Sequence, residues 1–331
     1  MNAPPRALSP HSIIAELERG AALGATLPPT NALFPGESDP PVVPDELCVG
    51  VLLASWDHPQ TRNPYWGPLM SAVRERLLAS SCSLITQGLY ATTDRTDPLR
   101  LSFTDRALDA GVDGIIVASL SPTDPEVSAL LAVGIPALFV DELGGPGNGT
   151  VMSDSRGGMA TVVEHLVAEG RRHIAHISGP LGSDPASERL AGFLSALEKA
   201  GLECPTGYIE SGDWLSRSAY DAAARLLALD RPPDAIAAAS DFQALGALAA
   251  LEDAGVRVPD DIAVTGFDGM YFTQTVEPQI TTLNQDSERI GRTAAEGLLQ
   301  MIEQPDAPPF NALIPVELVV RASSRQTHER Y

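Results

Sequence analysis

The chain has 331 residues, of which 44% are hydrophobic and 20% are charged. This composition is typical of a soluble protein large enough for two domains with cores of their own, and it excludes a short disulfide-stabilised scaffold. The formal net charge of −21 at pH 7 opposes binding to nucleic-acid phosphates unless basic residues gather in one patch, and the arginines are scattered along the sequence.

Cysteine usage and hydropathy favour a cytoplasmic protein. The three cysteines, Cys48, Cys82 and Cys204, are far apart and lack the spacing of metal ligands, so we expect reduced thiols. The first residues lack a cationic start followed by an apolar segment, and no run of 18 apolar residues occurs in the sequence. Neither export nor a membrane partner is therefore expected.

Residues 1–46 differ from the rest of the chain in composition and hydrophobic pattern. A short helix is favoured within "SPHSIIAELERGAAL", where Ser12, or Ser9 with Pro10, gives a start signal. The prolines and acids of "PPTNALFPGESDPPVVPDE" remove helix donors and disfavour burial. We therefore predict that residues 1–46 form a flexible, acidic, proline-rich segment.

From Leu47 onward, apolar segments of strand length alternate with amphipathic helical patterns. The first series contains the predicted strands "LCVGVLLAS", "CSLITQGLY", "DGIIVAS" and "IPALFVD". A second series follows "LGGPGNGTVMSD" and contains the predicted strands "RHIAHIS", "GYIESG", "DAIAAAS" and "DIAVTGF". Apolar strands separated by helices indicate parallel sheets that are covered on both faces.

The two series predict an α/β protein of two similar Rossmann-like β/α lobes joined by crossovers. We assign residues 47–153 and 284–310 to the N-terminal lobe, and residues 154–283 and 311–324 to the C-terminal lobe. Residues 325–331 are left as a tail. Because ligands of open α/β sheets bind beyond the carboxyl ends of the strands, two lobes that face each other there form a binding cleft.

Polar and aromatic residues follow the predicted strands at these positions. Carboxylates, a guanidinium, amides and an indole that converge on one cleft suit a polyhydroxylated or heterocyclic small molecule. An aspartate after a strand has the alternative role of a helix N-cap, and Asp241 before "FQALGALAAL" is the strongest such case. The candidate ligand-binding residues are Asn63, Asp141, Arg189, Trp214, Ser240, Asp241, Asp268 and Gln285.

Catalytic and metal-binding patterns receive little support. The sequence has no phosphate loop ending in Gly-Lys-Ser/Thr and no Gly-x-Ser-x-Gly elbow. His173 and His176 have a His-x-x-His spacing, but residues three apart on a strand point to opposite faces. We therefore expect no catalytic residue, no metal, no cofactor and no enzyme activity.

The order of several motifs resembles the effector-binding core of the LacI/GalR bacterial repressors. The resemblance extends from Leu47 to Ser324 and is most specific between Ala239 and Asp268. It implies a periplasmic-binding-protein-like fold of type I, which agrees with the two β/α series. The motifs are "IPALFVDE", "GGMATVVEHLVAEGRRHIAHISGPLGSDPASERLAGFLSAL", "GDW", "ASDFQALGALAALEDAGVRVPDDIAVTGFDG" and "PQITTLNQDSERIGRTAAEGLLQMI".

The resemblance also implies roles for single residues of the C-terminal lobe. Arg189 of "SERLAGF" is similar to the arginine that grips effector hydroxyl or carboxylate groups. Asp268 of "GFDG" resembles the aspartate that accepts hydrogen bonds from sugar or ribose hydroxyls, and Trp214 matches an aromatic that packs on the effector ring. Ser240 is a departure, since many relatives carry asparagine there.

Further roles concern the N-terminal lobe and the crossover. Asp141 has the position of a cleft aspartate, and Gln285 of "TLNQD" matches a cleft residue near the crossover. Asn63-Pro64-Tyr65 resembles the loop that approaches the ligand from the first lobe, which adds Tyr65 to the candidates.

Repressors of this family begin with a helix-turn-helix, rich in Lys and Arg, that reads operator DNA. Here residues 1–46 contain two basic residues, Arg6 and Arg19, against six acids. The chain thus resembles the sensor without the reader, and DNA binding by this chain alone is not expected.

The leading hypothesis is a cytoplasmic, homodimeric sensor of a carbohydrate or a nucleoside or purine effector. Two alternatives stay open: a LacI-type DNA-binding repressor with a diverged reader, and a sugar-binding protein without regulatory output. An exported solute-binding protein and an enzyme acting on a sugar or nucleoside are further alternatives.

Overall fold

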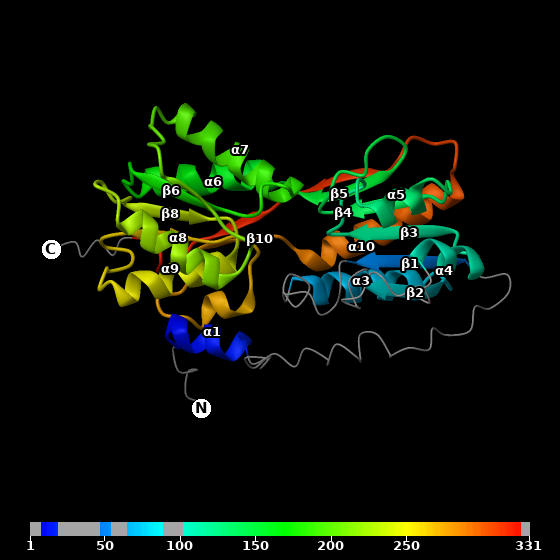
Figure 1. Cartoon of the computed structure of the whole chain (residues 1–331), viewed down its shortest axis with the longest axis horizontal. Coiled ribbons are helices and arrows are strands. Elements are labelled where there is room, and N and C mark those ends of the chain that lie inside the picture. Colours follow the sequence, from blue (N-terminus) through cyan, green and yellow to red (C-terminus); the bar gives the residue numbers. More distant parts are fainter. Residues whose placement is uncertain (1–7, 19–46, 54–64, 89–101, 326–331) are drawn as a thin grey trace. The chain divides into compact units, whose positions relative to one another are not determined.

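The computed structural model describes residues 8–18, 47–53, 65–88 and 102–325 (Figure 1). The chain divides into two compact units, each assembled from separate stretches of the sequence. Of the described residues, unit 1 comprises 8–18, 154–285 and 315–325, and unit 2 comprises 47–53, 65–88, 102–153 and 286–314.

The sheet of unit 2 is parallel and runs in the order β11-β5-β4-β3-β1-β2. Every residue of β1, β3, β4 and β5 is buried, as expected for continuous apolar strands covered on both faces. The strands are β1 (Cys48–Leu53), β2 (Ser83–Gly88), β3 (Gly114–Ala118), β4 (Ala137–Val140), β5 (Gly149–Ser153) and β11 (Asn311–Ile314).

The helices of unit 2 pack on this sheet around a core that includes Phe103, Ile115 and Phe139. A Cβ atom at Gly291 would collide with the backbone of Leu69, so glycine permits the close approach of α10 to α3. The helices are α3 (Trp66–Leu78), α4 (Phe103–Asp109), α5 (Pro125–Leu131) and α10 (Ser287–Glu303).

Unit 1 has a parallel sheet in the order β7-β6-β8-β9. Its helices α6 and α7 pack against each other, and α8 packs against α9 (Figure 1). The elements are β6 (Ile174–Ser178), β7 (Ile209–Ser211), β8 (Ala235–Ala238), β9 (Ala263–Thr265), α6 (Ser155–Ala168), α7 (Asp184–Lys199), α8 (Ser216–Leu227) and α9 (Asp241–Asp253).

A small antiparallel pair completes unit 1. Strand β10 (Thr282–Asn284) pairs with β12 (Glu317–Val319), and the 3-10 helix η1 (Tyr271–Gln274) precedes β10. The last described residues close the edge of the larger sheet: the Ser323 carbonyl accepts from the Val264 N–H at 2.8 Å, and the Ser323 hydroxyl donates to the Val264 carbonyl at 2.6 Å.

The prediction of two β/α series joined by several crossovers agrees with this topology, but one boundary differs. The sequence predicts that residues 311–324 belong to the C-terminal lobe, whereas Asn311–Ile314 form β11, the edge strand beside β5 in unit 2. The chain returns to unit 1 only at residue 315. Parallel pairing with β5 places β11 here, and Ile314 alone of its four residues is buried, so β11 differs from the fully buried strands of this sheet.

The N-terminal region contains an ordered helix. The expected short helix is α1 (Pro10–Glu18), and its Ile13 is completely buried. The Leu8 N–H donates to the Thr275 carbonyl at 3.0 Å, and the Glu277 N–H donates to the Leu8 carbonyl at 3.0 Å. The prediction of a flexible segment is therefore wrong for residues 8–18, while residues 19–46 lie outside the described residues.

Two general expectations concern thiols and membranes. Cys48, Cys82 and Cys204 are all free thiols. None of the helices in the described part of the chain is both long and apolar enough to cross a bilayer.

Candidate functional site

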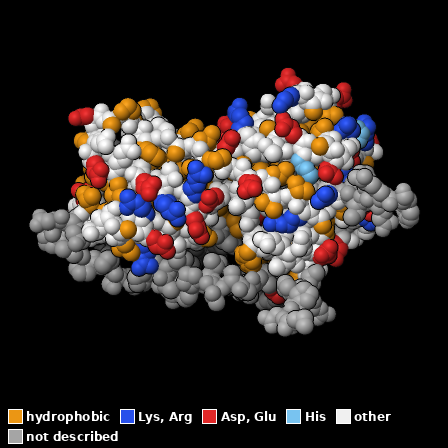
Figure 2. All heavy atoms as spheres, turned by 180° about the vertical axis from the view of Figure 1, so that it is seen from behind, with side chains coloured by type: hydrophobic (Ala, Val, Ile, Leu, Met, Phe, Trp, Pro, Cys, Tyr) orange, Lys and Arg blue, Asp and Glu red, His pale blue; other side chains and the backbone are white. Residues whose placement is uncertain are grey.

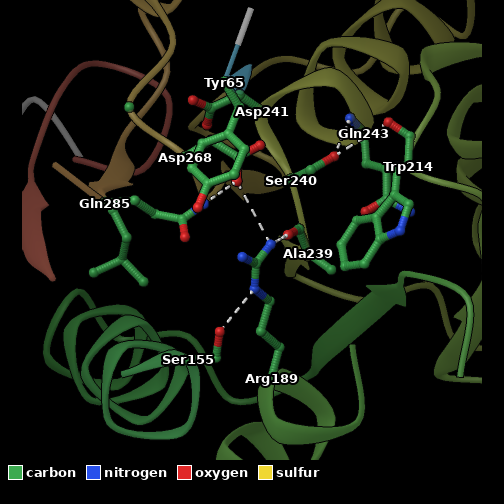
Figure 3. Close-up of polar contacts among 12 residues, drawn as sticks. Tyr65, Ser155, Arg189, Trp214, Ala239, Ser240, Asp241, Gln243, Asp268 and Gln285 are labelled. Carbon is green, nitrogen blue, oxygen red and sulfur yellow. Dashed lines mark hydrogen bonds and ion pairs between the residues drawn. The ribbon is translucent and has the colours of Figure 1, made fainter. Parts of the chain in front are cut away.

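The carboxyl edge of the unit 1 sheet gathers six of the predicted site residues (Figure 3). Each of these residues lies in a segment that follows a strand. Because parallel strands end at the same edge of their sheet, such segments lie close together. Arg189 lies on α7 after β6, Trp214 follows β7, Ser240 and Asp241 follow β8, Asp268 follows β9 and Gln285 follows β10.

Arg189 belongs to the buried stripe of α7. Ala186, Phe193 and Ala196 share this stripe at helical spacing, and all are buried. The guanidinium, 4% exposed, donates to the Ser155 hydroxyl at 3.3 Å through Nε and to the Ala239 carbonyl through Nη1. These contacts hold the side chain in one orientation at the end of β8.

Two aromatic rings flank this guanidinium. Its Cζ atom lies 3.7 Å from the centre of the Phe267 ring and 5.2 Å from the centre of the Trp214 ring, which is cation–π geometry. Trp214 has a left-handed backbone, with φ +70°, and its ring lies against Gly179, where a Cβ atom would collide with it. Gly179 is therefore required for this position of the indole.

Asp268 is the anionic partner of Arg189. Its Oδ1 lies 3.6 Å from Arg189 Nη1 and accepts a hydrogen bond from Gln285 Nε2 at 2.6 Å (Figure 3). The two charged side chains are 5% and 6% exposed. An ion pair at this depth carries a large desolvation cost, so the fold positions it with further hydrogen bonds. The cluster offers both strong acceptors and strong donors to a ligand.

Ser240 and Asp241 have different roles at the start of α9. The Ser240 hydroxyl accepts from the Gln243 N–H at 3.1 Å and is the N-cap of α9, so the interpretation of Asp241 as the cap is wrong. Asp241 is completely buried, and its carboxylate accepts from the Met270 N–H at 2.6 Å and the Thr282 hydroxyl at 2.5 Å. Burial, and then the nearby Asp268 charge, raise the pKa of Asp241 well above its ordinary value.

Two other predicted residues lie in unit 2. The Tyr65 hydroxyl donates to Asp141 Oδ2 at 2.7 Å, and Asp141 follows the carboxyl end of β4 with a left-handed φ of +61°. Tyr65 precedes α3 and is 6% exposed. Asn63 lies outside the described residues.

The His-x-x-His pair does not form a metal site in the described structure. His176 is completely buried in β6, where its Nδ1 hydrogen-bonds with the Ala237 carbonyl at 2.7 Å and its ring stacks on Phe193. Burial lowers the pKa of His176 to about 4, so the imidazole is neutral. Within the described ranges, no cluster of three or more His, Cys, Asp or Glu side chains has the arrangement of a metal site.

Sequence reasoning missed four residues that build the site. Ser155 and Phe267 contact the guanidinium, and Met270 and Thr282 contact the buried carboxylate. Phe267 was next to a predicted residue in "GFDG", so an aromatic neighbour was available as a signal. Met270 lies two residues after Asp268, but it makes its contact through its backbone N–H, which no sequence pattern marks. Ser155 and Thr282 lie on other elements, far in sequence from the side chains that they contact.

Basic side chains on the surface of unit 1 lie next to acidic ones. On the face shown in Figure 2, blue Lys and Arg side chains alternate with red Asp and Glu side chains. Arg156 pairs with Glu188 at 2.8 Å, Lys199 with Glu164 at 2.8 Å, and Arg225 with Glu210 at 2.7 Å. These cations are offset by neighbouring carboxylates and do not form a surface for phosphates.

Comparison with known proteins supports a periplasmic-binding-protein-like fold. Residues 163–324 match the family described as "Periplasmic binding protein-like domain", and this range includes all six site residues of unit 1. The transcriptional regulator CelR of Thermobifida fusca is 36% identical over 217 residues, which cover 64% of this chain and 63% of that protein.

Two solved structures are similar over most of their length. A complex of the transcriptional regulator CelR with cellobiose has a TM-score of 0.75 and 26% identity, covering 93% of this chain and 94% of that one. A lac repressor dimer bound to operator and the anti-inducer ONPF has a TM-score of 0.72 and 28% identity, covering 86% of this chain and 96% of that one.

Proposed function

This chain belongs to the LacI family of transcriptional regulators, and on that premise we propose that it senses a small carbohydrate bound at the carboxyl edge of the unit 1 sheet. The observation that carries the proposal is the Arg189–Asp268–Gln285 cluster, with aromatic rings beside the guanidinium. Vicinal hydroxyls donate to a carboxylate and accept from a guanidinium, while an indole face covers the apolar C–H surface of a sugar ring.

We assign direct contact with the sugar to Arg189, Trp214, Asp268 and Gln285. The similarity to the complex of the regulator CelR with cellobiose favours a carbohydrate over a nucleoside or purine. Tyr65 and Asp141, at the carboxyl edge of the unit 2 sheet, stay predicted contacts, and so does Asn63. Ser240 is 1% exposed and caps α9, so its proposed contribution is to the shape of the site.

A thermal-shift panel tests the proposal. The panel contains cellobiose, other disaccharides, ribose and other monosaccharides, nucleosides and purines, since a ligand that binds only the folded state raises its stability by RT ln(1 + [L]/Kd). We expect at least one sugar to raise the melting temperature by several degrees. If no sugar stabilises the protein while a purine or nucleoside does, the carbohydrate proposal is wrong.

Two variants localise the binding. Asp268→Asn retains the size of the side chain but removes its charge, and it is expected to abolish the sugar-induced shift. Asp221→Asn is the matched control because Asp221 lies in unit 1 and is 53% exposed, with Arg217 3.9 Å away. A sugar shift that survives in Asp268→Asn would place the ligand elsewhere.

We further propose a homodimer, supported by the similarity to the lac repressor dimer. Size-exclusion chromatography with light scattering at micromolar concentrations should give twice the chain mass. A monomer across that range would contradict the proposal.

A further inference from the structure

Asp241 closes both ends of the loop that carries Asp268. Its backbone N–H donates to the Phe267 carbonyl at 2.7 Å, and its Oδ2 accepts from the Met270 N–H at 2.6 Å. The four residues from Phe267 to Met270 are thus held between two hydrogen bonds to a single residue. Asp268 lies inside this closed loop.

The second carboxylate oxygen ties the same loop to β10. Oδ1 of Asp241 accepts from the Thr282 hydroxyl at 2.5 Å, and Thr282 Oγ1 accepts from the Gly269 N–H at 3.3 Å. The Asp268 N–H donates to the Leu283 carbonyl at 2.9 Å. The start of α9, the exit of β9 and the strand that leads to Gln285 therefore meet at one buried carboxylate.

The backbone of the loop requires such restraint. Asp268 has a φ of +125°, a region that residues with a side chain rarely adopt, and Gly269 follows with +78°. A conformation of this kind persists only where its surroundings over-determine it. A Cβ atom on Gly266 would collide with Asp241 Oδ1, so the carboxylate packs directly against the backbone that enters the loop.

We propose that Asp241 is a positioning residue, which holds residues 267–270 in the conformation that presents the Asp268 carboxylate to Arg189, Gln285 and the effector. It makes no contact with the effector itself, because the side chain is completely buried and both of its oxygens accept hydrogen bonds from the protein. The part that concerns the effector rests on the proposed function, whereas the restraint of the loop stands on geometry alone.

The chemistry of the contacts predicts which replacement preserves the loop. In Asp241→Asn, the amide oxygen can accept from the Met270 N–H, and the amide nitrogen can donate to Thr282 Oγ1. The Thr282 hydroxyl then has the Leu283 carbonyl, 3.5 Å away, as its acceptor. Asp241→Ala loses both side-chain bonds and leaves a buried N–H unpaired.

Hydrogen–deuterium exchange of the ligand-free protein provides the first test. We expect the amides of residues 268–271 to exchange at least about tenfold faster in Asp241→Ala, as lost hydrogen bonds predict, and to stay within about threefold of the wild-type rate in Asp241→Asn. Leu226→Ala, in the core of α8, controls for general destabilisation of unit 1. Thr282→Val, which removes one of the two donors, should give an intermediate rate and serves if Asp241→Ala does not fold.

The second test uses the sugar that most stabilises the wild-type protein in the thermal-shift panel. Asp241→Asn is expected to bind it within about threefold of wild type, and Asp241→Ala at least about tenfold more weakly. Unchanged exchange in Asp241→Ala would overturn the proposal. So would an Asn variant that keeps its protected loop but loses the sugar as fully as Asp268→Asn does, since that result makes Asp241 a ligand contact. If no sugar binds the wild-type protein, the proposed function fails while the exchange experiment still decides the role of Asp241.

Discussion

The guanidinium of Arg189 and the carboxylate of Asp268 form an ion pair of 3.6 Å in which neither side chain is more than 6% exposed. Removal of one partner leaves the other charge buried without compensation. Asp268→Ala should therefore lower the free energy of unfolding by about 3 kcal/mol, and Asp268→Asn, which retains polar contacts with Arg189 and Gln285, by clearly less. Urea titration of the ligand-free proteins measures both.

Asp221→Ala is the control for this prediction, because its pair with Arg217 is exposed and should contribute less than about 1 kcal/mol. Equal losses in Asp268→Ala and Asp221→Ala would show that the buried pair adds nothing to stability.

Gly179→Ala should displace the Trp214 indole, because the added methyl group would collide with the ring. We expect a shifted tryptophan emission spectrum and sugar binding weakened at least about tenfold, as for the loss of an aromatic contact. Gly182→Ala is the matched control from the same loop, since nothing lies within 4 Å of its Cβ position. The role of Gly179 would be refuted if its variant behaved like Gly182→Ala.

The neutral His176 predicts a loss of stability in acid. The pKa of His176 is lowered to about 4 in the folded protein, whereas the histidine of an unfolded chain has a pKa of about 6.5. As the pH falls, the unfolded state therefore binds the extra proton first. The contribution is complete above the unfolded pKa and is lost between pH 6.5 and pH 4. Between pH 7.5 and pH 5 this residue alone should cost about 2 kcal/mol.

Urea titrations of the wild-type protein and His176→Gln at the two pH values isolate this contribution, because all other titrating groups are common to both. The wild-type protein should lose more stability than the variant. Parallel losses would mean that His176 is protonated as readily in the folded state as in the unfolded chain.

The docking of α1 predicts that Ile13 stabilises the N-terminal helix. Ile13→Ala removes a completely buried side chain and should release residues 8–18, with loss of about 2 kcal/mol or more of local stability. Ser12→Ala, at an exposed neighbouring position, should have little effect. Faster amide exchange confined to residues 8–18 and 275–277 in Ile13→Ala is the expected signature, and unchanged protection there would contradict the docking.

The strands were predictable from sequence because most are fully buried and therefore appear as unbroken apolar runs. Arg189 could also be predicted from the sequence, because it is a charged residue on the apolar stripe of a helix. In contrast, the exchange of roles between Ser240 and Asp241 depends on how β10 registers against the exit of β9, which neighbouring residues do not encode. The same reason applies to β11 and α1, whose places depend on partners far away in the chain.

The contacts of Ser323 with Val264 impose an order on biosynthesis. The edge of the unit 1 sheet is completed by residues synthesised about sixty positions after β9, and Ser323 and Ser324 are both fully buried. All segments of unit 2 have been translated by residue 314, whereas unit 1 still lacks its last stretch. During synthesis, unit 2 can therefore close its core first, and the edge of the unit 1 sheet beside β9 is completed only after Ser323 has been translated.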